Sequence, residues 1–250
     1  MLKIRNCKFN IKYMKFIEKL IYGNKHTALK RKPNRAIYAQ IEHIKSVWDC
    51  KKYEDFGIER IFRLFLVCAQ FIFPGLYIRD ISGRHNVLTR KLWVEVYVIV
   101  KVILYLLILF YLPTKIWYCW IIIYLLIETF MYLLGLIFLN TEYRQPASYK
   151  RNLLMVIVNY IEISLGFAAI YYCAFRDAIC GLKSSIDAIY FSFISATTIG
   201  YGDMQPITNL AKFTCVAQSV ISFLFTVFII GIFLSNFDKL GYINNNNKKA

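Results

Sequence analysis

The chain has 250 residues, of which 58% are hydrophobic and 18% charged, below the charged fraction of roughly a quarter that is usual for soluble domains. This composition excludes an ordinary soluble globular protein and indicates a membrane protein. The net charge is +16 and unevenly placed: residues 1–60 hold fifteen basic and six acidic side chains, roughly +9 of the total.

The first 60 residues are predicted to form a basic cytoplasmic segment. Lys and Arg beside apolar spans mark the cytoplasmic side of a membrane and attract anionic lipid headgroups. We therefore expect residues 1–60 to contact the lipid bilayer and not nucleic acid. The apolar residues between Phe9 and Ile21 are interleaved with lysines, which is typical of an amphipathic helix on the membrane surface or of an ordinary solvated helix.

Residues 61–80 contain a short apolar segment. The segment carries Arg63 near its start and Pro74 near its end, and basic residues flank it on both sides. A full crossing would place one of these basic flanks outside the membrane. We therefore predict an interfacial or re-entrant helix.

Four further segments are long enough to cross a bilayer, since a spanning helix needs about 20 mainly apolar residues. The first two are predicted to form a transmembrane helical hairpin over residues 92–139. After the fourth comes a cytoplasmic tail, residues 239–250. The four segments cover residues 92–112, 117–139, 153–174 and 213–236.

Basic residues predict the orientation of these segments. Arg90 and Lys91 precede the first segment, and Arg144, Lys150 and Arg151 lie between the second and the third. Both places are therefore expected on the cytoplasmic side, together with the N- and C-termini, whereas residues 175–212 face the outside. We predict an all-α integral membrane protein, located in the plasma membrane.

Three ionisable residues, Lys101, Glu128 and Glu162, lie roughly ten residues inside their spans and therefore near the bilayer midplane. Charges at that depth usually pair or face polar cavities. We expect a structural network in which Lys101 pairs with Glu128, Glu162 or both; a gating role for a protonatable Glu is the alternative. Residues 117–139 contain no Lys or Arg, so conventional voltage sensing is not expected.

The outward-facing region contains a short helix followed by a glycine motif. Ser184, Ser185 and Asp187 are N-cap and first-turn signals for a helix that continues to about Ala196. Residues 197–203 then read Thr-Thr-Ile-Gly-Tyr-Gly-Asp. The two glycines permit positive φ, which lets successive carbonyls turn towards one axis instead of alternating as in a strand. Rings of such oxygens can replace the water around a cation.

This motif resembles the selectivity filter of the potassium channel family, and the resemblance covers residues 150–238. It implies a potassium channel pore domain with an outer helix, a pore helix, a filter and an inner helix. It also implies passive K⁺ permeation through a homotetramer, with K⁺ as the permeant ion and no cofactor. The implied K⁺ ligands are the carbonyls of Thr198, Ile199, Gly200 and Tyr201, with the Thr198 hydroxyl, and Gly202 completes the filter.

Thr197, Asp203 and Tyr190 are predicted to support this filter. Where some family members carry an acid that braces the filter aspartate, this chain has Ile194. The Tyr190 hydroxyl is our candidate hydrogen-bond partner for Asp203. Plain packing of the Tyr190 ring is the alternative interpretation.

Polar residues on the last span predict the lining of an ion cavity. Ser219, Ser222 and Thr226 follow a helical i, i+3, i+7 spacing, and Ile230 continues the same face. In a tetramer this face would line the water-filled cavity, and Ile230 would narrow its cytoplasmic exit. Alternatively, the hydroxyls bond carbonyls of their own helix.

Other site types have little support in the sequence. Seven cysteines are scattered without metal-site spacing, although Cys173 and Cys180 lie where they could form a disulfide. His26, His43 and His85 lack the surroundings of a catalytic triad or a metal site, so an enzyme is not expected. A non-conducting regulatory subunit and a non-selective cation channel are the competing functions.

Overall fold

The computed structural model describes residues 35–48, 57–84, 87–112, 115–139 and 149–237, and these are almost entirely helical. Most of the basic segment and the tail, residues 239–250, lie outside the described residues. The elements before the first span are α2 (Ala36–Trp48), α3 (Ile58–Ala69), the short 3-10 helix η1 (Gln70–Ile72) and α4 (Pro74–Ser82).

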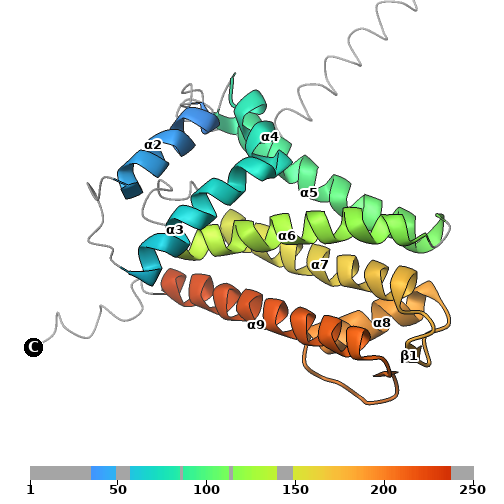
Figure 1. Ribbon diagram of the computed structural model, residues 1–250. Coiled ribbons are helices and arrows are strands. Elements are labelled where there is room, and N and C mark those ends of the chain that lie inside the picture. The colour runs from blue at the N-terminus through green and yellow to red at the C-terminus, as the bar shows by residue number, and fades with distance from the viewer. Residues whose placement is uncertain (1–34, 49–56, 85–86, 113–114, 140–148, 238–250) are drawn as a thin grey trace, which may run out of the picture.

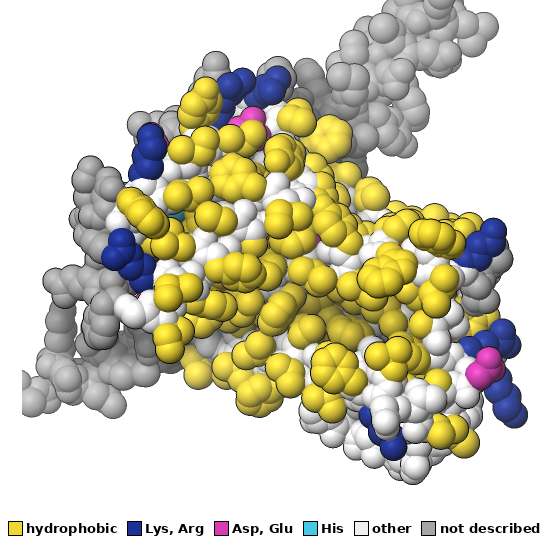
Figure 2. Space-filling view, in the orientation of Figure 1, with side chains coloured by type: hydrophobic (Ala, Val, Ile, Leu, Met, Phe, Trp, Pro, Cys, Tyr) yellow, Lys and Arg dark blue, Asp and Glu magenta, His cyan; other side chains and the backbone are white. Residues whose placement is uncertain are grey.

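Four helices in the described part have the length and apolarity to cross a membrane, which confirms the four predicted segments to within a few residues. In Figure 1 they run side by side, and Figure 2 shows hydrophobic side chains over the middle of this face with Lys and Arg toward its ends. The helices are α5 (Val87–Phe110), α6 (Ile116–Phe138), α7 (Tyr149–Ala174) and α9 (Asn209–Phe237).

Helix α7 is the centre of the packing, since it contacts α5, α6, α9 and the short helix α8 (Ser185–Ala196). Small residues allow this close packing: Ala168 and Ala169 are fully buried. A Cβ atom added to Gly166 would lie 2.6 Å from Leu126 Cδ2. Gly166 is therefore needed where α6 and α7 approach each other.

The segment from α3 to α4 is bent by 71° between Ile72, the end of η1, and Pro74, the start of α4. Phe62, early in α3, contacts Phe138 at the end of α6. The bend lies farther along α6, where the Tyr124 hydroxyl donates to the Ile72 carbonyl over 2.8 Å. Helix α4 then packs against α5.

Two short strands, β1 (Ile179–Cys180) and β2 (Gln205–Pro206), enclose α8 and the glycine motif between them. They pair antiparallel, with Ile179 opposite Pro206. The possible disulfide between Cys173 and Cys180 is not formed, because both cysteines are free. The Cys173 thiol instead contacts Cys119 of α6.

Candidate functional site

Helix α8 begins with the capping arrangement that its sequence predicts. The Asp187 backbone N–H donates to Ser184 Oγ over 3.2 Å, and the Ser184 backbone N–H donates to Asp187 Oδ2 over 2.7 Å. These bonds form a reciprocal capping box and lower the pKa of the Asp187 carboxyl. The helix therefore starts at a fixed point and ends at Ala196, directly before the motif.

Backbone hydrogen bonds orient the first residues of the motif. The N–H groups of Thr197 and Thr198 donate to the carbonyls of Phe193 and Ser195, over 2.9 and 3.2 Å. Those of Ile199 and Gly200 both donate to the Ile194 carbonyl, over 3.0 and 3.3 Å. These N–H groups point toward α8. Because the carbonyl and the N–H of one peptide unit point in opposite directions, the carbonyls of these peptide units point away from α8.

The motif alternates between backbone conformations. Thr198, Gly200 and Gly202 have positive φ values of 59°, 53° and 80°, whereas Ile199 and Tyr201 do not. Thr198 is the only non-glycine residue with positive φ in the described part of the chain, a conformation that costs about 1–2 kcal/mol. Positive φ at every second residue is the backbone pattern that permits successive carbonyls to turn to one side.

Residues 197–203 are exposed along their whole length in the single chain, while α8 behind them has five buried residues, Ala188, Phe191, Ser192, Ile194 and Ala196. Among the described residues, no hydrogen bond reaches the carbonyls of the four implied K⁺ ligands. One side of the segment is thus attached to α8 by its N–H groups, and its other backbone groups include unpaired carbonyl oxygens. The unpaired carbonyls belong to Thr198, Ile199, Gly200 and Tyr201.

The predicted supporting residues lie close to the motif. The Tyr190 hydroxyl lies close enough to the Asp203 carboxylate to interact with it, and this interaction is the main cause that raises the pKa of the Tyr190 phenol. The Thr197 hydroxyl donates to the Phe193 carbonyl over 2.8 Å and so reinforces the end of α8. Ile194 stands where some potassium channels carry an acid that braces the filter aspartate. Its backbone carbonyl accepts from the N–H groups of Ile199 and Gly200.

The four predicted cavity residues do not share one environment. Thr226 and Ile230 are exposed and Ser219 is half-buried. Ser222 is only 1% exposed inside the single chain, so the prediction that it lines a cavity between chains is wrong. The hydroxyls of Ser219 and Thr226 donate to carbonyls of their own helix, at Cys215 and Ser222.

Sequence reasoning missed two polar residues that connect the helices around the motif. The Tyr160 hydroxyl of α7 donates to the Ala196 carbonyl, the last of α8, over 3.0 Å. Gln218 of α9 is completely buried and also bonds to α8. An uncharged amide in the middle of an apolar span was the available signal for Gln218.

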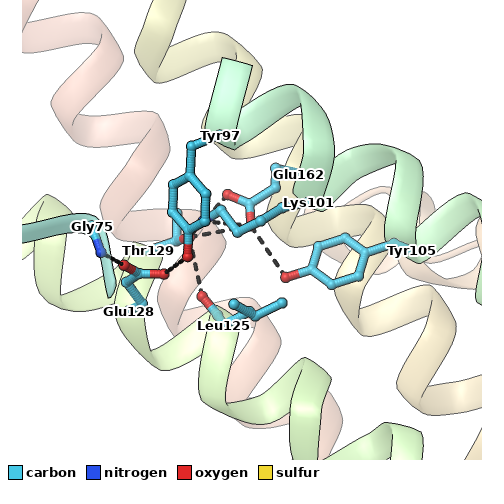
Figure 3. A network of polar contacts seen from close by, with 8 residues as sticks. All are labelled: Gly75, Tyr97, Lys101, Tyr105, Leu125, Glu128, Thr129 and Glu162. Carbon is cyan, nitrogen blue, oxygen red and sulfur yellow. Dashed lines mark hydrogen bonds and ion pairs between the residues drawn. The ribbon is translucent and has the colours of Figure 1, made fainter. Parts of the chain in front are cut away.

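Lys101 forms an ion pair with Glu162 near the middle of α5 and α7. Lys101 Nζ lies 3.1 Å from Glu162 Oε1, and the two side chains are only 5% and 0% exposed. Thr129 bridges the pair, accepting from Lys101 over 2.6 Å and donating to Glu162 Oε2 over 2.9 Å. The Tyr105 hydroxyl also donates to Glu162, as Figure 3 shows. The buried charges are therefore compensated.

Glu128 has different partners from Lys101. Its Oε1 accepts from the backbone N–H of Gly75 over 2.8 Å, and its Oε2 accepts from the Tyr97 hydroxyl. Gly75 lies in the first turn of α4, where free N–H groups favour a negative charge. Of the two alternatives for Lys101, the structure thus has Glu162, and Glu128 fixes the bend before α4 (Figure 3).

Comparison with known proteins identifies relatives of the C-terminal part. Residues 156–239 match a family described as ion channel. A voltage-gated potassium channel of Aeropyrum pernix is 30% identical over 80 residues, 32% of this chain and 27% of that relative. Potassium channel K2 of Plasmodium falciparum is 41% identical over 73 residues, 27% of this chain and 5% of that relative. No solved structure gives a significant match.

The four membrane-length helices make this an all-α membrane protein. Residues 156–239 carry the ion channel match, which indicates a channel and not an enzyme. The relatives that cover this part of the chain are named as potassium channels, so residues 156–239 are similar to part of a potassium channel. The matched region spans 27% or less of the length of the three curated relatives that head the comparison, which include a two-pore potassium channel of Arabidopsis thaliana.

Proposed function

We propose that the chain is one subunit of a potassium-selective channel in which backbone carbonyls bind dehydrated K⁺. The observation that carries this proposal is the backbone of residues 197–202. Its first N–H groups donate to α8, and its φ angle is positive at every second residue. Among the described residues, the carbonyls of Thr198, Ile199, Gly200 and Tyr201 have no hydrogen-bond partner, whereas that of Gly202 accepts from Gln205 Nε2. Such oxygens can replace the hydration shell of K⁺.

The exposed filter segment supports a homotetramer. A single chain supplies one strand of carbonyls, so four copies are needed to close a ring around an ion. Helix α9 leaves apolar side chains exposed over its whole length, which further copies of the pore domain would cover in part. They include Phe213, Val220, Phe223, Val227 and Ile230.

The bent segment supports the proposed orientation. Phe62 lies beside the C-terminal end of α6, the bend lies nearer the middle of that helix, and α4 leads back to the start of α5. A segment that enters and leaves on the cytoplasmic side is re-entrant and preserves the four-span topology. Both termini are then cytoplasmic, and the basic segment faces anionic lipid, as in a plasma membrane.

Conventional voltage gating is not part of the proposal. Helix α6 has no basic residue, and Lys101 of α5 is paired with Glu162. A voltage sensor instead moves several basic residues through the field.

The test of the proposed function is an ion-flux measurement on the purified chain. Reconstituted in liposomes, it should pass K⁺ far faster than Na⁺, and in mild detergent it should have the mass of a tetramer. Empty liposomes give the background leak. Equal K⁺ and Na⁺ flux, or a stable monomer, would contradict the proposal.

We also propose that Tyr190 braces the filter through Asp203. Tyr190→Phe removes only the hydroxyl, so packing is nearly constant and any effect reports the bond. We expect unchanged K⁺ selectivity in the open state but open periods shortened several-fold during sustained activity. Single-channel recordings of both proteins under identical conditions provide the measurement. Unchanged open durations would leave Tyr190 as a packing residue.

A further inference from the structure

Gln218 makes a complete set of hydrogen bonds although it lies inside an apolar helix. Its side chain is 0% exposed. Nε2 donates to both the backbone carbonyl and the hydroxyl of Ser192 in α8, each over 2.8 Å. Its Oε1 accepts from the Tyr171 hydroxyl of α7 over 2.6 Å. One amide thus connects the inner, pore and outer helices.

The connection continues beyond the amide. The Ser192 hydroxyl donates to the Ser164 carbonyl of α7 over 2.6 Å. Both Nε2 hydrogens and the Oε1 atom of Gln218 are therefore used, and Ser192 is joined to two helices. Removing one member of such a buried network leaves its partners unsatisfied, which costs more than one average hydrogen bond.

The network lies close to the filter along a rigid element. Ser192 is one helical turn before Ala196, where α8 ends, and residues 197–200 bond back to the last turn of this helix. Any shift of Ser192 therefore moves the carbonyls to which the filter is attached. At the other end of the connection is α9, the proposed inner helix of the pore.

We propose that Gln218 is a positioning residue for the ion filter: it fixes α8 against α9, so that movement of the inner helix changes the stability of the conducting filter. This inference rests on the proposed potassium conduction. It assigns to Gln218 a role in filter stability and none in ion contact, because its side chain is buried away from the exposed segment.

The test uses the full chain in planar bilayers, with the decay of K⁺ current during sustained opening as the readout. Gln218→Met keeps the length of the side chain and removes its hydrogen bonds. We expect decay about tenfold faster at low K⁺, the size expected for losing one to two net hydrogen bonds. High K⁺ should restore much of the lifetime, because ions bound to the conducting filter stabilise it by mass action.

Two further variants make the test specific. Ser192→Ala removes a partner of Gln218, and its effect should combine with Gln218→Met less than additively. It also serves as the milder variant if Gln218→Met does not assemble. Asn159→Leu is the control. Asn159 of α7 is buried and polar, as Gln218 of α9 is, but its Oδ1 has no hydrogen-bond partner among the described residues. It should keep the wild-type lifetime.

The outcomes separate the two proposals. A wild-type chain without selective K⁺ current contradicts the proposed function itself. With wild-type current present, a Gln218→Met lifetime and K⁺ dependence equal to wild type would overturn the role of Gln218. So would faster decay that is insensitive to K⁺ and matched by Asn159→Leu, since that result indicates a general loss of stability.

Discussion

Gly202→Ala is expected to abolish selective K⁺ conduction while folding and tetramer assembly remain largely intact. Gly202 has a φ of +80°, and a Cβ atom there would meet no other atom within 4 Å in the single chain. The cost is therefore conformational, about 1–2 kcal/mol per chain. The backbone can avoid this cost by leaving the positive-φ region, which turns the neighbouring carbonyls away from the ion path.

Gly57→Ala is the matched control for this prediction. Gly57 also has positive φ, +66°, and also has free space for a Cβ atom, but it lies at the start of α3, far along the chain from the filter. Its ψ of −136° lies in a region that is almost confined to glycine, so an Ala there should cost at least as much, and the variant should still retain K⁺ selectivity. Flux assays on both variants test the idea, and selective conduction by Gly202→Ala would refute it.

Lys101→Met is expected to destabilise the protein by about 3–5 kcal/mol, because it leaves Glu162 buried without its cation. The double variant Lys101→Met with Glu162→Gln should recover much of this loss. Denaturant unfolding in detergent gives the four free energies of the cycle. Strictly additive effects would show that the two charges do not interact.

A second ion pair provides the comparison for Lys101. Arg151 Nη2 lies 2.6 Å from Glu95 Oε1, but both side chains are about a third exposed. An exposed pair usually contributes no more than about 1 kcal/mol. Arg151→Met should therefore cost much less than Lys101→Met, and equal losses would mean that burial is not the cause.

The elements near the filter were predictable from sequence because their signals are local. The cap at Ser184 and Asp187 and the glycines at 200 and 202 determine backbone geometry within a few residues. The four spans were predictable for a similar reason, since length and apolarity are properties of each segment alone.

Partner choice was not predictable in the same way. Lys101, Glu128 and Glu162 have similar depths, but which of them meet depends on how each helix is rotated and on the N–H groups at the start of α4. Ser222 was misplaced for the same reason, because spacing along a helix shows a common face but not what covers it. Tertiary packing decides both cases.

The contact between Glu128 and Gly75 has a consequence for the order in which the chain enters the membrane. Its two partners are 53 residues apart, so Gly75 is synthesised well before Glu128. Free N–H groups inside lipid are costly, even though Pro74 removes one of them. Residues 70–75 should therefore stay at the membrane surface until α6 has been inserted. They should move to their final depth only after the Glu128 carboxylate is present to accept the hydrogen bond from the Gly75 N–H.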